Sequence, residues 1–400
     1  MKLTDETYLQ VFERVGKNDM QNVFTPPRLI RRMLSRMNFM SNDKVLVWYN
    51  VEFVIFLVRE VGLRPENIYI YTNTQDKLIL RNNGYNVIYQ EDIDFDKMSK
   101  LINVKFDVVI GNPPYQKQVG PKKTEAIWPK FVDKSFEICK EDGYVSLIHP
   151  IGWRDVDGKY KNTQKLLLSK NVVYLAMNDI KDGVKTFGVK TPYDWYVVKN
   201  IENNNNYYTE ILDHKGIINK ICLFGLEYIP NCNFDFVINL IANNGEETVD
   251  VLYDCSYHHQ YDNTSKEMVN GFIYPCVYSI KKDNIPTFYY SNTNGKGHFN
   301  IPKVIFGNGA NPTYMVDYNG EFGMCEFTYG VINYDLNIIE QSLKSKKISL
   351  ITEAFKYNNT QGQPIFNRRI LSTFKKDFWR YFLDENNNVI DPNFENVERI

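Results

Sequence analysis

The sequence predicts an α/β protein whose first half forms a doubly wound, mostly parallel sheet and whose second half is a mixed α+β domain. Up to residue 150, short apolar β-like runs alternate with segments of helical periodicity, which is typical of parallel sheets. The polar run 203–206 ends this alternation, and turn-rich pieces such as 306–312 follow. A chain of 400 residues exceeds one ordinary core. We therefore predict two domains, 1–202 and 203–400.

The elements expected in the first half follow from periodicity and capping signals. A polar helix is expected over 1–23, and Thr25 and Pro26 are suited to the cap and first turn of a second helix. Strands are expected at 44–49, 67–72, 86–90, 106–110 and 143–149, and further helices at 53–61, 75–84, 95–103 and 126–140. Ligands bind beyond the carboxyl ends of such strands, and segment 111–115 occupies one of these ends.

Composition and charge narrow the class of protein. A hydrophobic content of 43% with 24% charged residues excludes wholesale disorder. The formal net charge is −1, from 47 Lys and Arg against 48 Asp and Glu, so the chain lacks the basic excess of many nucleic-acid binders. A local basic face on a neutral protein stays compatible with this balance.

Cysteine and histidine spacing predicts no metal site. None of the six cysteines has Cys-x-x-Cys or zinc-ligand spacing, and the adjacent pair His258-His259 need not converge on one ion. We expect reduced, structural thiols and a cytoplasmic protein. The first residues lack the apolar core of a signal peptide, and no apolar run approaches the ~18 residues of a membrane span, so no membrane partner is expected.

The tetrapeptide Asn112-Pro113-Pro114-Tyr115 carries the chemistry of the first half. Asn112 offers a side-chain carbonyl, Pro113 a backbone carbonyl on a stiff chain, and Tyr115 a flat face for stacking. Two acceptors at one strand end can hold an aromatic amino group, such as that of adenine, by its hydrogens and turn the nitrogen lone pair toward a methyl donor. The alternative is a proline-rich turn after a buried strand.

With these residues in place, the first half resembles the adenine-N6 DNA methyltransferases of restriction–modification systems, in the arrangement that has the recognition domain last. Phe24-Thr25-Pro26 resembles their amino-terminal cofactor motif, and 108–115 resembles their catalytic motif. Phe187 resembles the aromatic residue that stacks on the flipped base, although an ordinary core aromatic is the alternative. The resemblance implies a Rossmann-like methyltransferase sheet over 1–202 and a target-recognition domain over 203–400.

The same resemblance implies a function. It implies transfer of a methyl group from S-adenosylmethionine to an adenine flipped out of double-stranded DNA at a specific site. Catalysis is expected from the tetrapeptide 112–115, with Tyr115 and Phe187 stacking on the base. The residues expected at the cofactor are Phe24, Thr25, Pro26, Glu52, Asp92 and Asn112.

The stretch after the first strand departs from this family. The family has a glycine-rich turn there, which lets the backbone approach the donor, whereas 47–53 has no glycine and places Val51 and Phe53 in that space. Three outcomes are open: the donor binds in a modified pose through Thr25, Glu52 and Asp92, a partner protein subunit completes the site, or donor binding is lost and base handling is kept. The alternative function is thus an impaired DNA-binding or specificity component that needs a partner.

Other functions fit the same residues less well. RNA or protein-amide methyltransferases share the tetrapeptide, but the long second half and the Thr-Pro segment favour DNA. No paired-carboxylate nuclease pattern is present. DNA contacts are expected from Lys303 and 368–380 in the second half, whereas Lys117, Lys122 and Lys123 fit either phosphate contacts or a solvated loop. His149 is expected to be a structural residue.

Overall fold

The computed structural model describes residues 23–121, 123–155, 158–243, 245–309, 312–332, 334–355 and 368–390. The chain divides into two compact units, Met1–Ile229 and Pro230–Ile400. The polar run 203–206, expected to separate the domains, lies inside the first unit, because the strands that follow it join the first sheet. The helix expected over 1–23 and Lys122 lie outside the described residues.

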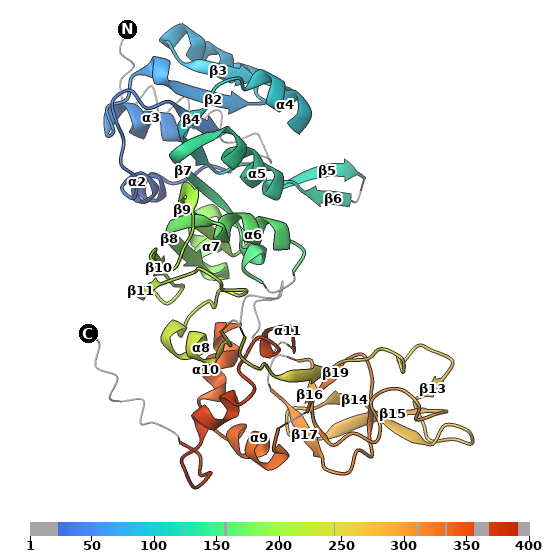
Figure 1. Cartoon of the computed structure of the whole chain (residues 1–400). Helices are drawn as coiled ribbons and strands as arrows, with labels where there is room; N and C mark the ends of the chain where they lie inside the picture. Colours follow the sequence, from blue (N-terminus) through green and yellow to red (C-terminus); the bar gives the residue numbers. More distant parts are fainter. Residues whose placement is uncertain are drawn as a thin grey trace. The chain divides into compact units, whose positions relative to one another are not determined.

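The described part of unit 1 forms one nine-stranded sheet in the order β11-β10-β8-β9-β7-β4-β1-β2-β3 (Figure 1). Strands β3, β2, β1, β4 and β7 run parallel, and β9 is antiparallel to both of its neighbours. The strands are β1 (Val45–Trp48), β2 (Ile68–Thr72), β3 (Asn86–Tyr89), β4 (Phe106–Gly111), β7 (Cys139–Pro150), β8 (Lys170–Asn178), β9 (Tyr193–Glu202), β10 (Thr209–Leu212) and β11 (Ile218–Ile221). The predicted α/β sheet is confirmed, with one antiparallel strand inside it.

Helices connect these strands much as the periodicity predicts. They are α2 (Pro27–Leu34), α3 (Glu52–Arg59), α4 (Phe95–Leu101), α5 (Trp128–Ile138), α6 (Lys161–Leu168) and α7 (Ile180–Phe187), together with the 3₁₀ helix Gln75–Asn83 where an α-helix was expected. The α2 helix starts one residue later than predicted, with Pro26 as its N-cap and no side-chain cap. Thr25 is not the cap because its backbone is engaged elsewhere, as described below.

Strands β1 and β4 lie at the point where the strand order reverses, which is where doubly wound sheets bind ligands. Alternate residues of β1 face opposite layers: Val45 and Val47 pack in the core that contains α2 and α3, while Trp48 donates a 2.8 Å hydrogen bond to Ser135 of α5. Gly111 at the end of β4 has φ 154°, and a Cβ there would lie 2.7 Å from the Trp48 carbonyl oxygen. Only glycine permits this close approach directly before Asn112.

Unit 2 confirms the predicted mixed α+β character. It contains a four-stranded sheet β12-β19-β16-β17, a second four-stranded sheet β13-β15-β14-β18, and short helices between 234 and 371 within its described part (Figure 1). The strands are β12 (Asp250–Leu252), β13 (Thr264–Ser265), β14 (Tyr274–Ile280), β15 (Pro286–Ser291), β16 (Lys303–Gly307), β17 (Tyr314–Asp317), β18 (Gly323–Met324) and β19 (Thr328–Ile332). Across the described residues, no helix is both long and apolar enough to cross a membrane.

One residue of unit 2 corrects the sequence analysis. Lys303 is fully buried, and its ammonium group donates to the Asp317 carboxylate at 2.8 Å and to the Phe322 carbonyl at 2.7 Å. Lys303 was expected to contact DNA phosphate, which is wrong, because a group held inside the β16–β17 pair cannot reach a backbone outside the protein.

Candidate active site at the ends of β1 and β4

Three polar residues singled out in the sequence, Thr25, Glu52 and Asn112, meet Asn50 where β1 and β4 end. The Asn112 backbone N–H donates to Asn50 Oδ1 at 3.0 Å. Asn50 Nδ2 donates to Glu52 Oε1 at 3.0 Å, and the same Glu52 oxygen accepts the Thr25 backbone N–H at 2.7 Å. All four residues are buried, so the hydrogen bonds within this network satisfy polar groups that solvent reaches little.

The Glu52 carboxylate is the hub of this network. Burial raises the pKa of Glu52 above its ordinary value, while the hydrogen bonds from Thr25 and Asn50 and the nearby positive charge of Lys77 oppose that rise. Its Oε1 atom is already used twice by protein donors. Glu52 therefore ties the segment before α2 to the turn after β1.

The Asn112 carboxamide is oriented through its nitrogen. Asn112 Nδ2 lies 3.5 Å from Thr25 Oγ1, and within the described part of the chain no hydrogen bond to Asn112 Oδ1 is found. The side-chain oxygen is thus the free acceptor of the group. An acceptor with this orientation can receive a hydrogen from an amino group.

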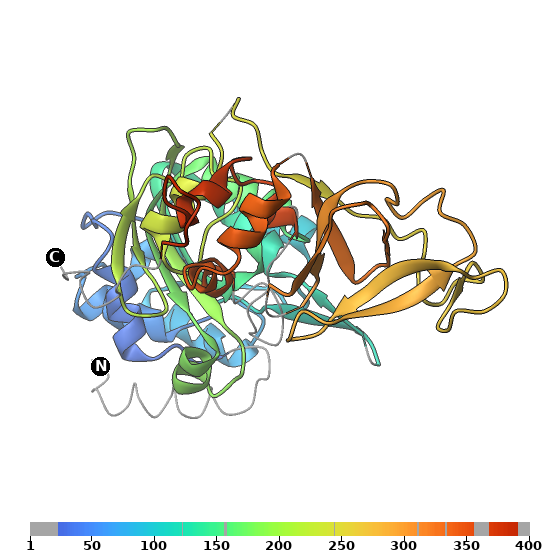
Figure 2. The ribbon, with the colours of Figure 1, turned by 90° about the horizontal axis from the view of Figure 1, so that it is seen from below.

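Tyr115 closes the tetrapeptide and starts a hairpin. Its backbone carbonyl accepts from the Ile127 N–H at 3.0 Å, so the chain leaves and returns at the same place. The intervening strands β5 (Gln116–Gly120) and β6 (Lys123–Ala126) pair only with each other and project from unit 1 (Figure 1, Figure 2). Pro113 and Pro114 are buried, whereas the Tyr115 ring is partly exposed at the base of the hairpin.

The turn after β1 is tightly filled. Tyr49 adopts φ 60°, and the Asn50 N–H folds back to the Trp48 carbonyl at 2.7 Å. The buried Lys77 places its nitrogen 2.8 Å from the Tyr49 carbonyl, and Val51 and Phe53 belong to the core. The turn therefore lacks the open backbone that a glycine-rich loop offers to a ligand.

Comparisons with known proteins match this half of the chain. Residues 63–187 match the family described as Eco57I restriction-modification methylase. Over 261 residues the chain is 24% identical to the type II restriction enzyme and methyltransferase RM.Eco57I of Escherichia coli, which covers 54% of this chain and 26% of the relative. Residues 63–187 are therefore similar to a restriction–modification methylase. The chain spans about a quarter of the length of the curated relative it matches.

Two solved structures illustrate the range of similar folds. A type IIL restriction–modification enzyme, MmeI, solved in complex with DNA, aligns at 8% identity with a TM-score of 0.46, over 92% of this chain and 65% of that one. The methyltransferase subunit of a type I restriction–modification system from Streptococcus thermophilus aligns at 14% identity with a TM-score of 0.40, over 52% of this chain and 51% of that one.

The family match begins at residue 63, after the glycine-free turn. It includes Asp92, the tetrapeptide and Phe187, and it leaves out Thr25, Asn50 and Glu52. The matched segment therefore runs from just before β2 to the last residue of α7. The segments that complete the Asn112 network lie outside the match.

Phe187 lies at the last position of α7 and packs edge-on against Tyr193, with ring centroids 4.9 Å apart. Tyr193 donates its hydroxyl to Thr186 Oγ1 at 3.1 Å, and its proximity adds to the burial that raises the pKa of Tyr115. Tyr193 thus packs against one of the two aromatic residues proposed from sequence, Phe187. Sequence reasoning missed Tyr193 because a strand tyrosine carries no local signal of a site.

The remaining predicted cofactor residues are less engaged. Phe24 is 44% exposed, Pro26 serves as the N-cap of α2, and Asp92 is exposed in the loop between β3 and α4. Lys117 of the hairpin donates to the Ile93 carbonyl at 3.2 Å, which brings the base of β5 to that loop. In the described residues no hydrogen bond joins Asp92 to the Asn112 network, so its role stays a prediction.

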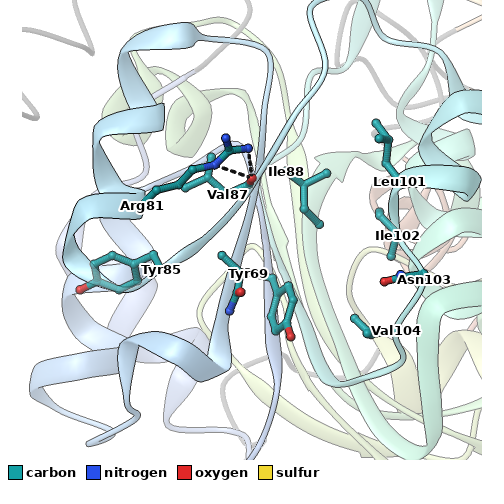
Figure 3. A pocket seen from close by; sticks show the side chains of 10 residues that line it. Tyr69, Arg81, Tyr85, Val87, Ile88, Leu101, Ile102, Asn103 and Val104 are labelled. Carbon is teal, nitrogen blue, oxygen red and sulfur yellow. Dashed lines mark hydrogen bonds between the residues drawn. The ribbon is translucent and has the colours of Figure 1, made fainter.

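Two other features of the methylase domain lie off this site. His149 is buried and stacks on Trp128 with centroids 4.3 Å apart, and burial lowers the pKa of His149 to about 4, as expected for a structural histidine. A cavity of about 340 Å³ opens between Tyr69, Arg81, Tyr85, Ile88 and 101–104 (Figure 3). It lies at the amino-terminal edge of β2 and β3, the edge opposite Asn112.

Proposed function

We propose that this chain is the base-handling part of a DNA adenine-N6 methyltransferase. The observation that carries the proposal is the Asn112 carboxamide, anchored through its backbone to Asn50 and through its nitrogen to Thr25, with Oδ1 left as a free acceptor. The similarity of residues 63–187 to restriction–modification methylases supports double-stranded DNA as the substrate class. The adenine specificity rests on the tetrapeptide Asn112-Pro113-Pro114-Tyr115.

The proposed chemistry follows from two acceptors on one amino group. Asn112 Oδ1 and the Pro113 carbonyl each accept one hydrogen of the adenine amino group, which favours the geometry in which the nitrogen lone pair leaves the ring plane. The two prolines and the Gly111–Trp48 contact keep the acceptors in place before the base arrives. Tyr115 and Phe187 flank the base, which must leave the duplex to reach a strand end.

S-adenosylmethionine supplies the methyl group in this class of reaction, and the turn after β1 does not fit it. Tyr49, Val51 and Phe53 occupy the turn, and Glu52 is already bonded to Thr25 and Asn50. The sulfonium of the donor would also meet the positive charge of Lys77 near that turn. We propose that DNA or a partner protein is needed before the donor binds.

The packing of this turn also favours a second candidate function. A chain that keeps the Asn112 network and fills the donor turn with Lys77 and Tyr49 can serve as a base-binding specificity component. In that case the methyl transfer belongs to a partner subunit. The two candidates share base extrusion and differ in whether this chain carries the reaction.

The β5–β6 hairpin is the proposed DNA contact next to the flipped base. It is a two-stranded ribbon, the form that fits a major groove, and it starts one residue after the tetrapeptide. Gln118 and Lys123 are exposed on it, and Lys123 can meet backbone phosphate. Further contacts are proposed from the second half of the chain, without Lys303.

The deciding experiment offers the purified chain a labelled methyl donor with duplex DNA, single-stranded RNA or a glutamine-containing protein. Methylation of DNA at adenine N6, detected by mass spectrometry of the digested nucleosides, is the expected result. Methylation of RNA or protein alone would overturn the DNA assignment. Extrusion of a base from DNA by this chain without any methylation would support the second candidate, in which a partner subunit carries the methyl donor.

A further inference from the structure

A histidine–glutamate cluster lies in unit 2. It consists of His258, His259 and Glu326, whose ligand atoms all lie within 4.8 Å of one another. The histidines belong to the loop between β12 and β13, and Glu326 lies between β18 and β19. Nothing in the sequence indicates that the adjacent histidines converge, but both lie close to the Glu326 carboxylate.

The geometry of the cluster approaches that of a bound ion. Glu326 Oε1 lies 3.7 Å from His258 Nε2 and is in hydrogen-bond contact with His259 Nδ1. Ligands on one tetrahedral zinc ion are roughly 3.4 Å apart, given metal–ligand bonds of about 2.1 Å. Small shifts of the two rings would therefore place three donors around one ion.

The charge balance of the cluster also favours a cation. The Glu326 side chain is 7% exposed, and buried carboxylates are normally paired with a cation or a metal. Across the described residues its ion-pair partners are the two histidines, with no Lys or Arg among them. Two neutral imidazoles and one carboxylate leave a net negative charge that a divalent ion would offset.

The surroundings make the cluster a bounded site. Tyr278, Tyr289 and Phe327 surround His259, with ring centroids 5.4, 6.0 and 5.9 Å from the imidazole. The two histidines are 26% and 24% exposed, so the open side admits a small ion. For His258 to bind an ion through Nε2, its ring proton must sit on Nδ1. A protonated Nδ1 cannot accept the 3.2 Å hydrogen bond from the Gln260 N–H, so this exposed N–H would then bond to water.

We propose that His258, His259 and Glu326 form a site for a divalent transition-metal ion, with Zn²⁺ as the best match to two imidazoles and a carboxylate. The ion would fasten the loop 253–263 to the segment between β18 and β19. This function is structural and independent of methyl transfer. The fourth position of the ion faces the open side.

The test uses the tag-free full chain, stripped with EDTA and titrated with ZnCl₂ by calorimetry. We expect one Zn²⁺ equivalent that His258→Ala, His259→Ala and Glu326→Gln each weaken at least about tenfold, since each removes one of three ligands. The melting temperature of the wild type should rise with Zn²⁺ concentration, because an ion that binds the folded state stabilises it. Co²⁺ should give the absorption bands of a tetrahedral site in the wild type only.

The control is His298→Asn, which changes a histidine in the same unit at a left-handed position that asparagine tolerates. It should bind Zn²⁺ as the wild type does. Circular dichroism of the metal-free variants distinguishes loss of fold from loss of a metal ligand. If His259→Ala unfolds, Glu326→Gln still tests the site, because glutamine keeps the shape of the glutamate side chain. Wild-type protein that binds no Zn²⁺, or variants that bind it unchanged, would show that the cluster is only a histidine–carboxylate hydrogen-bond pair.

Discussion

The backbone N–H of Asn112 donates to the side-chain oxygen of Asn50 at 3.0 Å, so the first residue after β4 is held by the second residue after β1. This bond orients the tetrapeptide from a segment that carries no recognisable cofactor motif. Asn50 and Glu52 are the two polar residues in a turn whose other side chains are aromatic or aliphatic, and both take part in the network around Asn112.

Asn112→Ala should abolish methyl transfer while leaving DNA affinity nearly unchanged. The proposed bond from the amino group to Asn112 Oδ1 strengthens as the reaction proceeds, so its loss should lower the rate by about 100-fold or more. Steady-state methylation and DNA binding by fluorescence anisotropy measure the two effects. Asn103→Ala, an exposed asparagine at the amino-terminal edge of the sheet, is the matched control. Unchanged turnover in Asn112→Ala would refute the assignment.

Glu52→Gln should change how stability depends on pH. Burial raises the pKa of Glu52 in the folded state above its ordinary value of 4.5, so the wild type holds a proton there that the unfolded chain releases. That contribution to stability is present below pH 4.5 and is lost as pH rises through the folded pKa. The glutamine side chain of the variant would keep an acceptor for Thr25 and Asn50 without this loss.

The measurement is the free energy of unfolding of unit 1, obtained from urea titrations between pH 4.5 and about pH 8. The free-energy difference between Glu52→Gln and wild type should move in favour of the variant as pH rises, then level off. Parallel pH profiles for the two proteins would mean that Glu52 has the same pKa folded and unfolded.

Tyr115→Ala should reduce base extrusion. A fluorescent adenine analogue at the target should brighten when it leaves the helix stack, and stacking on an aromatic face offsets part of the few kcal/mol that extrusion costs. Phe187→Ala should give a smaller loss, because its ring already packs against Tyr193. No brightening with any DNA sequence would point to binding without extrusion.

Lys123→Ala should weaken DNA binding and lower its salt dependence. Loss of one phosphate contact reduces the slope of log affinity against log salt by about 1. Lys100→Ala, also exposed but on the last turn of α4, is the matched control and should leave the slope unchanged. Equal slopes for Lys123→Ala and wild type would remove the hairpin from the DNA interface.

The sequence could predict the parallel strands β1, β2, β3, β4 and β7 because they contain apolar runs bounded by turns, as β1 and β4 show. It did not predict β8, β9, β10 and β11, which complete the sheet. It could predict that Asn112 stands at a strand end, because strand and tetrapeptide are contiguous. It could not predict that Glu52 Oε1 would accept hydrogen bonds from both Thr25 and Asn50, because the bond from Thr25 joins two separate segments of the chain. The buried ion pair of Lys303 with Asp317 could not be predicted for the same reason, because it joins residues of two different strands.

The hairpin β5–β6 and the histidine–glutamate cluster show the same limit. The hairpin sequence is polar and basic, and nothing in it distinguishes a paired ribbon from a solvated loop. The cluster joins adjacent histidines to a glutamate far along the chain, so no spacing rule for metal ligands could include it. Long-range pairing was decided by the tertiary fold in both cases.

The methyl donor should bind the free chain weakly or undetectably and should bind more tightly when DNA or a partner protein is present. Val51 and Phe53 fill the turn after β1, and Lys77 adds positive charge close to it, so the free chain offers few backbone contacts to a sulfonium ligand. Coupling between donor and DNA is reciprocal, so the donor should tighten DNA binding by the same factor. Calorimetry with S-adenosylmethionine, alone and with duplex DNA, measures both affinities.

Replacing Val51 and Phe53 together by glycine should improve donor binding, provided that circular dichroism shows an intact fold. Val119→Gly on the exposed hairpin is the control for added backbone freedom. Tight binding of the donor by the isolated wild-type chain, abolished by substitutions in residues 49–53, would show that the filled turn is itself the donor site.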